Sequence, residues 1–232
     1  MTLAELVKAY FCYPAIQVYI LLAAVGVGMT VFLAPSVLLV GLAAGAGFLA
    51  YPLAWYLLHR FILHGRFLYK SPRTAALWKR IHYDHHRDPN DLGVLFGALR
   101  TTLPTIIMIT MPLGWLIGGP GGSAAALVAG LVATCFYEFC HCIQHLAYAP
   151  KLAFLRRVKK LHLAHHFHNE SGNFGITNFL WDRLLGTYYP NVDQVPRSAT
   201  VFNLGYAGSE TTRFPWVAEL SEPETEVSPR RV

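Results

Sequence analysis

Four long stretches of the chain carry almost no charge, and this feature most constrains the fold. Residues 16–33, 37–58 and 101–118 contain no Asp, Glu, Lys or Arg. Residues 123–145 contain a single acid, Glu138. Each stretch approaches or exceeds the length of a bilayer-spanning helix, about 20 residues. The sequence therefore predicts an all-α integral membrane protein with four transmembrane helices.

Short turns pair these stretches into two helical hairpins, one turn at residues 34–36 and one in the glycine-rich residues 118–122. The segments outside the hairpins are basic: residues 59–100 contain eight Lys and Arg, and residues 146–200 contain seven. Basic segments stay on the cytoplasmic side of a membrane. We therefore expect both termini and both basic segments on that side, the segments forming a helical cap.

The charge and cysteine content exclude several other classes of protein. Only 14% of the residues are charged, compared with about 25% in an average globular domain, which excludes a disordered chain and a nucleic-acid-binding domain. The four cysteines lie in apolar sequence without C-x-x-C spacing, which argues against a zinc knuckle or a disulfide scaffold. We expect one membrane-embedded domain over residues 1–232, with a disordered tail at 220–232.

All 11 histidines lie between positions 59 and 168, and ten of them form four groups. On a helix, residues three or four apart share a face, whereas adjacent residues diverge by about 100° and residues five apart by about 140°. His141 and His145 can therefore reach one ion together, whereas the members of each other group cannot all do so but can serve two ions. The groups are His59 and His64; His82, His85 and His86; His141 and His145; and His162, His165 and His166.

Ten histidines would give each of two ions five imidazole ligands and leave one position open for a small exogenous ligand. Imidazole suits iron, zinc, copper and nickel. The chain contains no H-E-x-x-H motif, which disfavours a zinc protease. An all-histidine pair of redox metals beside a membrane indicates oxygen chemistry on a lipid.

Glu138 and His168 are candidates for supporting these ligands. Asp84, Asp88 and Asp182 could play the same part, although caps, turns and surface pairs explain these three acids equally well. Glu138 precedes His141 by three positions and shares its helix face, and a carboxylate commonly accepts a hydrogen bond from a ligating imidazole. The alternative for Glu138 is a place at the headgroup boundary. His168 lies outside the chelating pattern, so we expect it to support a ligand or to face solvent. The sequence predicts no other catalytic residue.

The histidine groups, their order and their place beside two helical hairpins resemble the fatty acid hydroxylase superfamily, which includes sterol desaturases and carotenoid hydroxylases. The resemblance covers residues from about 50 to 190. Within it, the long gap between His64 and His82 and the segments 86–96 and 160–182 are most similar to fatty acid 2-hydroxylases that act on sphingolipid acyl chains.

This resemblance implies a di-iron centre, with zinc possible in purified protein, and dioxygen as co-substrate. It implies hydroxylation of an aliphatic C–H bond in a lipid acyl chain, at the 2 position of a fatty acid or sphingolipid. It also implies a division of the ligands. One metal would be held by His59, His82, His85, His162 and His165, and the other by His64, His86, His141, His145 and His166.

Because only residues 1–15 precede the first apolar stretch, without room for a cytochrome b5 domain, we expect a separate electron carrier of the cytochrome b5 or ferredoxin type. We expect a bacterial inner membrane in preference to the endoplasmic reticulum. A sterol or carotenoid hydroxylase or desaturase would use the same histidines. A metal transporter or haem protein is a more distant alternative, because eight of these ten histidines lie outside the apolar stretches.

Overall fold

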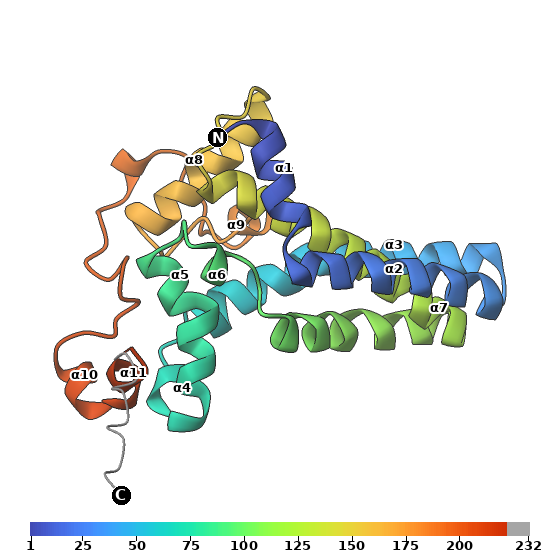
Figure 1. Cartoon of the computed structure of the whole chain (residues 1–232), viewed down its shortest axis with the longest axis horizontal. Coiled ribbons are helices and arrows are strands. Elements are labelled where there is room, and N and C mark those ends of the chain that lie inside the picture. The colour runs from blue at the N-terminus through green and yellow to red at the C-terminus, as the bar shows by residue number, and fades with distance from the viewer. Residues whose placement is uncertain (222–232) are drawn as a thin grey trace, which may run out of the picture.

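The computed structural model describes residues 1–221, which fold into helices and connecting segments without a β-strand. Long helices extend to one side, and a group of shorter helices, here called the cap, lies at the other end (Figure 1). The all-helical prediction is confirmed for these residues. The long helices are α2 (Pro14–Leu33), α3 (Val37–Leu57) and α7 (Leu99–His145). The shorter ones are α1 (Leu3–Phe11), α4 (Pro72–Trp78), α5 (Asp84–Arg87), α6 (Leu92–Leu95), α8 (Ala153–Phe167), α9 (Leu180–Leu184), α10 (Ser209–Arg213) and α11 (Trp216–Glu219).

Three helical segments are long and apolar enough to cross a membrane: Pro14–Leu33, Val37–Leu63 and Leu92–His145. Their outward side chains are largely apolar, since Val37 is 90% exposed and Phe32 is 85% exposed. A helix that is apolar on all sides is stable on the surface of a protein only when lipid surrounds it.

α7 consists of two limbs joined at Gly118 and Gly119, where the backbone is not helical. Gly119 has a φ of 59°, a left-handed conformation that glycine adopts without a steric cost. Across this hairpin Gly114 and Gly122 approach so closely that a Cβ on either one would overlap the other's carbonyl oxygen. The chain thus reverses where the sequence predicts a turn, although four membrane spans remain a prediction.

An aromatic group packs where α3 meets the second limb of α7. Trp55 stacks on Tyr137 with ring centroids 5.6 Å apart, and Tyr51 meets Tyr137 edge-on at 6.2 Å. Trp55 and Tyr137 each precede a histidine, His59 and His141 respectively, by four residues. One helical turn therefore separates this aromatic group from two of the predicted metal ligands.

Lys159 joins α8 to the end of α7. Its ammonium group donates hydrogen bonds to the carbonyls of Ile143, Leu146 and Tyr148 at 3.0, 2.7 and 2.9 Å. The last carbonyls of a helix have no partner within it, and a cation there also interacts favourably with the helix dipole. This contact sets the position of α8 relative to the histidines at the end of α7.

The last described residues pack against α4. Trp216 donates its indole N–H to the carbonyl of Tyr69 at 2.7 Å, and the Tyr69 hydroxyl donates to Glu210 at 2.6 Å. Tyr69 also packs with Trp78 of α4 in one buried cluster. The expected tail at 220–232 lies from residue 222 onward outside the described residues.

Candidate metal centre

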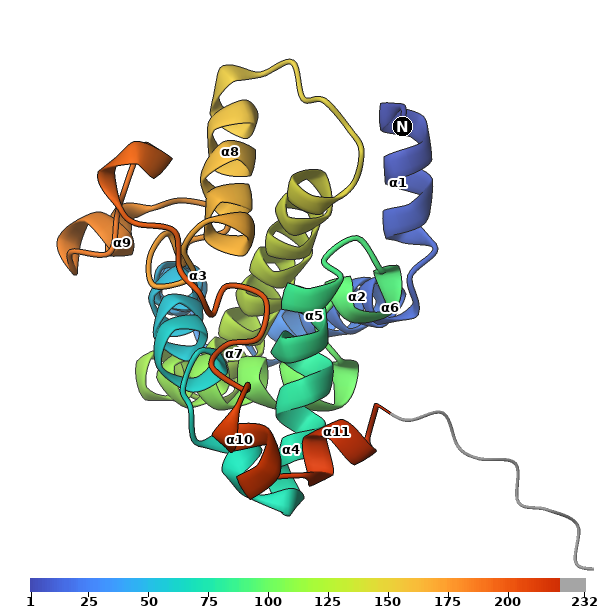
Figure 2. The same cartoon turned by 90° about the vertical axis from the view of Figure 1, so that its left-hand side faces the viewer.

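The ten predicted histidine ligands meet where the long helices join the cap. Figure 2 shows α5, α8 and the cap ends of α3 and α7 around this centre. The histidines form two clusters, and within each cluster five ligand atoms lie within 4.8 Å of one another, so that each could hold a metal ion. Cluster A contains His59, His64, His82, His86 and His165, and cluster B contains His85, His141, His145, His162 and His166.

The imidazole nitrogens in cluster A converge as ligands of one ion do. Nε2 of His64 lies 2.8 Å from Nε2 of His82 and 3.1 Å from Nε2 of His165. It lies 3.3 Å from Nε2 of His59. One imidazole nitrogen carries either a proton or a lone pair, so it cannot hydrogen-bond to three others. Nitrogens about 2.0–2.1 Å from one metal and at right angles are about 3 Å apart, so the spacing fits a shared ion.

The two clusters differ from the division of ligands that the family resemblance implies. That division assigns His64 and His86 to one metal, and His59, His85 and His162 to the other. Cluster A instead joins His59 to His64 and His86, and His85 and His162 belong to cluster B. His59 and His64 share a cluster because α3 ends in a π-helix, η1 (Leu58–Leu63). In it the N–H of His64 donates a hydrogen bond to the carbonyl of His59 at 3.1 Å. That five-residue repeat puts both imidazoles on one face. The expected division of the ligands is wrong for four residues: His64, His85, His86 and His162.

Neighbouring histidines are divided between the clusters, as the helix geometry predicts. On α8, His162 and His166 are four residues apart and belong to cluster B, whereas His165 belongs to cluster A. Residues 82–86 show the same arrangement, because their outer two histidines belong to cluster A and His85 belongs to cluster B. Four-residue spacing keeps two imidazoles on one side of a helix.

Burial keeps the imidazoles neutral. Nine of the ten are buried and His64 is partly buried. Loss of hydration lowers the pKa of His86 and His165 to about 3, and neighbouring imidazoles add to the effect. Burial likewise holds the pKa of His82 and His162 well below its ordinary value. The neutral form offers the lone pair that a metal requires.

Backbone carbonyls orient three of the cluster A histidines. In each case Nδ1 donates a hydrogen bond to a carbonyl oxygen, which fixes the tautomer and leaves Nε2 free to bind a metal. The pairs are His59 with Phe174 at 2.7 Å, His165 with Gly172 at 2.7 Å, and His86 with Val201 at 3.0 Å.

Asp182 holds the loop that supplies the Phe174 carbonyl. Its fully buried carboxylate accepts the backbone N–H groups of Phe174 and Gly175 at 2.8 and 2.9 Å, and the Thr187 hydroxyl at 2.8 Å. Burial raises the pKa of Asp182, and these three donors act in the opposite direction. Asp182 thus acts on His59 through the loop backbone.

Replacing Asp182 with alanine should lower the free energy of unfolding by about 3 kcal/mol, because the N–H groups of Phe174 and Gly175 and the Thr187 hydroxyl lose their acceptor. Thermal unfolding in detergent would measure the loss. Asp193→Ala is the matched control, since Asp193 is exposed and its removal should change the melting temperature little. Equal melting temperatures for the two variants would contradict this role for Asp182.

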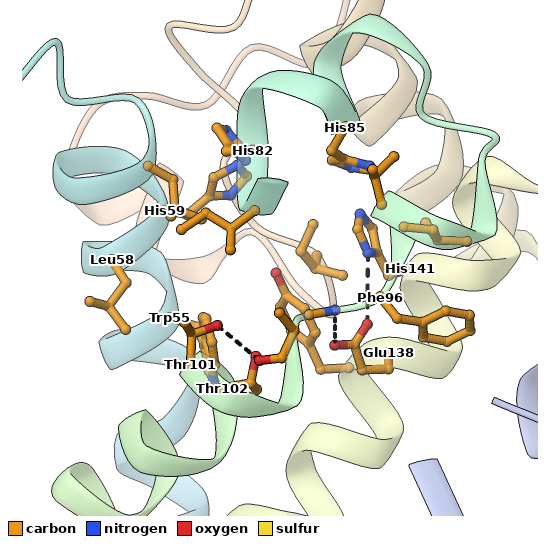
Figure 3. A pocket seen from close by; sticks show the side chains of 18 of the residues that line it. Trp55, Leu58, His59, His82, His85, Phe96, Thr101, Thr102, Glu138 and His141 are labelled. Atoms are coloured by element: carbon orange, nitrogen blue, oxygen red, sulfur yellow. Dashed lines mark hydrogen bonds and ion pairs between the residues drawn. The ribbon is translucent and has the colours of Figure 1, made fainter. Parts of the chain in front are cut away.

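Glu138 lies beside its predicted partner without bonding to it. One carboxylate oxygen, Oε1, accepts the N–H of Gly97 at 3.0 Å. The other, Oε2, lies 4.0 Å from Nδ1 of His141, as Figure 3 shows. That separation is too long for a hydrogen bond, so support of His141 by Glu138 remains a prediction. His168 lies outside both clusters, and its Nε2 donates to the carbonyl of Val195 at 2.8 Å.

A cavity of about 230 Å³ borders both clusters. Many of its walls are apolar, including Leu58, Ile62 and Phe96, and three threonines of the first limb of α7 also line it. Figure 3 shows its histidines above the threonines and Glu138. Histidines of both clusters border the cavity: His59, His82, His85, His141, His162 and His166.

The sequence model of the fatty acid hydroxylase family matches residues 44–187. The chain belongs to this family. The matched region contains all 11 histidines, Glu138 and Asp182. Val201, whose carbonyl orients His86, lies outside it.

Characterised members of the fatty acid hydroxylase family are similar to the chain over much of its length. The ceramide very long chain fatty acid hydroxylase SCS7 of Saccharomyces cerevisiae is 32% identical over 61% of this chain and 36% of its own length. The dihydroceramide fatty acyl 2-hydroxylase FAH2 of Arabidopsis thaliana is 30% identical over 64% of this chain and 61% of its own. The rat fatty acid 2-hydroxylase is 29% identical over 62% of this chain and 38% of its own. The chain therefore spans about a third to three fifths of these relatives.

The fold is also similar to a solved member of the hydroxylase family, full-length Scs7p, of which only the hydroxylase domain is visible. The two structures superpose with a TM-score of 0.62 at 28% sequence identity. The similarity covers 78% of this chain and 66% of that one. Most of the long helices and cap of this chain therefore have a counterpart in that hydroxylase domain.

The carbonyl groups that orient the ligands could not be predicted from the sequence. Gly172, Phe174 and Val201 act through backbone carbonyls, which every residue carries, so no residue type marks them. Asp182, which holds the Phe174 carbonyl in place, was among the acids that the sequence offered as possible supports.

Proposed function

We propose that this protein hydroxylates an aliphatic C–H bond of a membrane lipid, at the 2 position of a fatty acyl chain. The observation that carries the proposal is a largely apolar cavity bordered by histidines of both clusters. Apolar walls suit a hydrocarbon chain, and metals held by imidazole suit its oxidation. The relatives' names, fatty acid 2-hydroxylase and ceramide hydroxylase, favour an acyl substrate.

We further propose that each cluster binds one iron ion, with zinc able to replace it in purified protein. Imidazole is a ligand that suits iron, and the nitrogen spacing in cluster A fits a shared ion. When bound, the two ions would supply dioxygen activation: with two external electrons and two protons, one oxygen atom would enter the C–H bond and the other would leave as water. The chain's own residues hold and orient the ions and the substrate.

The cavity walls would position the acyl chain and exclude water. Ile62 lines the cavity and is also 38% exposed, near the cap end of the apolar segment Val37–Leu63. A chain entering there would come from the bilayer. Trp55 and Tyr137 would form the wall one turn from His59 and His141. A fixed position of the reacting carbon is what makes such a reaction selective.

The membrane arrangement proposed here is four spans, with the second limb of α7 as the fourth, within one membrane-embedded domain. The three apolar segments and the turn at Gly118–Gly119 support it. Both termini and the cap would lie in the cytoplasm, because the cap holds most of the basic residues. We propose a bacterial inner membrane as its location.

A separate electron carrier would dock on α8. Arg156, Arg157 and Lys160 are exposed on this helix, and its buried side carries His162 and His165. An acidic carrier bound there would lie about one helix diameter, roughly 10 Å, from both clusters.

Reversing charge with Arg156→Glu and Lys160→Glu should raise the KM for an acidic carrier about tenfold, because electrostatic steering is lost. The wild-type rate should also fall with added salt. Steady-state kinetics with a reduced cytochrome b5 or ferredoxin would measure both effects. Arg73→Glu, an exposed residue of α4, is the control, and an equal rise in KM for it would contradict the proposed surface.

The activity itself is tested by expressing the protein in a host without 2-hydroxylated lipids and analysing total acyl chains by mass spectrometry. We expect a hydroxyl group at the 2 position. A hydroxyl or double bond found only in sterols or carotenoids would overturn the acyl substrate and support that branch of the superfamily instead.

A further inference from the structure

The two clusters differ in the hydrogen bonds made by the imidazole nitrogens that point away from the proposed metal ion. Backbone carbonyls accept a hydrogen bond from three of the five imidazoles in cluster A. In cluster B, Nε2 of His145 and Nε2 of His162 converge at 2.8 Å. Among residues 1–221, no group bonds to Nδ1 of His141, His145 or His162, or to either nitrogen of His85 and His166.

The carbonyls that orient cluster A come from two segments after α8, the turn 168–175 and the segment 195–201. These segments are bonded to each other. The N–H of Ser198 donates to the carbonyl of His168 at 2.8 Å, and Nδ2 of Asn169 donates to the carbonyl of Pro196 at 2.8 Å. The segment 195–201 is thus tied to the chain directly after the α8 histidines.

Glu170 makes the buried part of this connection. Its side chain is only 6% exposed, and its Oε1 accepts the hydroxyl of Ser198 at 3.0 Å and the hydroxyl of Thr200. Val201 follows Thr200 directly, and its carbonyl accepts the hydrogen bond from Nδ1 of His86. Glu170 therefore determines where the carbonyl that orients His86 lies.

We propose that the two metal sites are unequal: cluster A binds its ion first and releases it slowly, cluster B exchanges its ion readily, and Glu170 is a positioning residue for cluster A. Outer hydrogen bonds to a ligating imidazole fix its orientation and raise its basicity, and losing one costs roughly 10–100-fold in metal affinity. Cluster A has three such bonds, whereas in cluster B the described residues supply an acceptor only beside His141, from the Leu95 carbonyl and Glu138. The inference rests on the proposed function only in requiring two bound metal ions.

The test uses the purified full-length chain loaded with two equivalents of Co²⁺ and mixed with excess chelator, with metal release followed by visible absorption. We expect two phases of one equivalent each, the slow phase at least about tenfold slower than the fast one. Glu170→Ala should abolish the slow phase and leave the fast phase unchanged. Glu170→Gln should restore the slow phase, because an amide oxygen accepts the same two hydroxyl hydrogen bonds.

If Glu170→Ala fails to fold, the double variant Ser198→Ala with Thr200→Val removes the same two bonds from the opposite side and should also abolish the slow phase. Ser171→Ala is the matched control, because Ser171 is exposed in the same turn, and it should keep both phases. Release of both equivalents in one phase would overturn the proposal, as would an unchanged slow phase in Glu170→Ala or in the double variant. Metal release is measured without lipid, so two phases in a protein without hydroxylase activity would contradict only the proposed function.

Discussion

Alanine in place of His82 or His145 is expected to remove one of two bound metal ions and to lower lipid hydroxylation at least about 100-fold. His82 belongs to cluster A and His145 to cluster B, so each variant should retain the ion of the other cluster. A lost ligand should cost more than the roughly 10–100-fold in metal affinity that a lost outer hydrogen bond costs. Elemental analysis and product analysis on the same sample would measure both effects.

The matched control for these variants is His168→Gln. His168 lies outside both clusters and donates from Nε2 to the carbonyl of Val195, and a glutamine amide can donate to the same carbonyl. This variant should keep two ions and most of its activity. Full activity in His82→Ala or His145→Ala would contradict the requirement for two metals.

A tryptophan at position 105 is expected to lower hydroxylation about 100-fold without any loss of metal. Thr105 lines the cavity of about 230 Å³ on the first limb of α7, and a large ring there would displace the acyl chain from the metals. Misplacement of a reacting group by about 1 Å can already cost on the order of 100-fold in rate. Turnover and metal content would be measured together.

Met108→Trp is the control for the Thr105 variant. Met108 lies three residues further along the same limb and is 68% exposed, so its replacement adds the same ring on the outside of the protein. This variant should retain activity. Similar losses in both variants would show that a large ring disturbs the limb in general, and would contradict the cavity as the substrate site.

The sequence predicted the helices well because their signal is local. An uncharged stretch of membrane length can only be a helix in lipid, since every backbone N–H and C=O must be bonded within the segment. The turn at Gly118 and Gly119 was also predictable, because a run of glycines and a proline interrupts the apolar pattern. The cap was less predictable, since its short helices depend on contacts such as that of Tyr69 with Trp216.

The ten histidines could be identified from spacing, but their division into clusters could be predicted only for the adjacent pairs, His85 with His86 and His165 with His166. Spacing arguments assume an α-helix, and η1 and a second π-helix, η3 (Lys79–Tyr83), break that assumption close to the ligands. π-Helices occur often at functional sites, although no residue type marks them. The carbonyls that orient the ligands could not be predicted for a related reason. The position of a carbonyl such as that of Val201 depends on the fold and not on the type of residue.

The central claim is that a pair of histidine-held metals oxidises the 2 position of a lipid acyl chain. The most direct measurement supplies the purified protein, loaded with two irons and a working reductant, with an acyl lipid and dioxygen labelled with heavy oxygen. Mass spectrometry of the product should find one labelled oxygen at the 2 position. An acyl chain recovered without label, from protein shown to hold two irons and to be reduced, would contradict the claim.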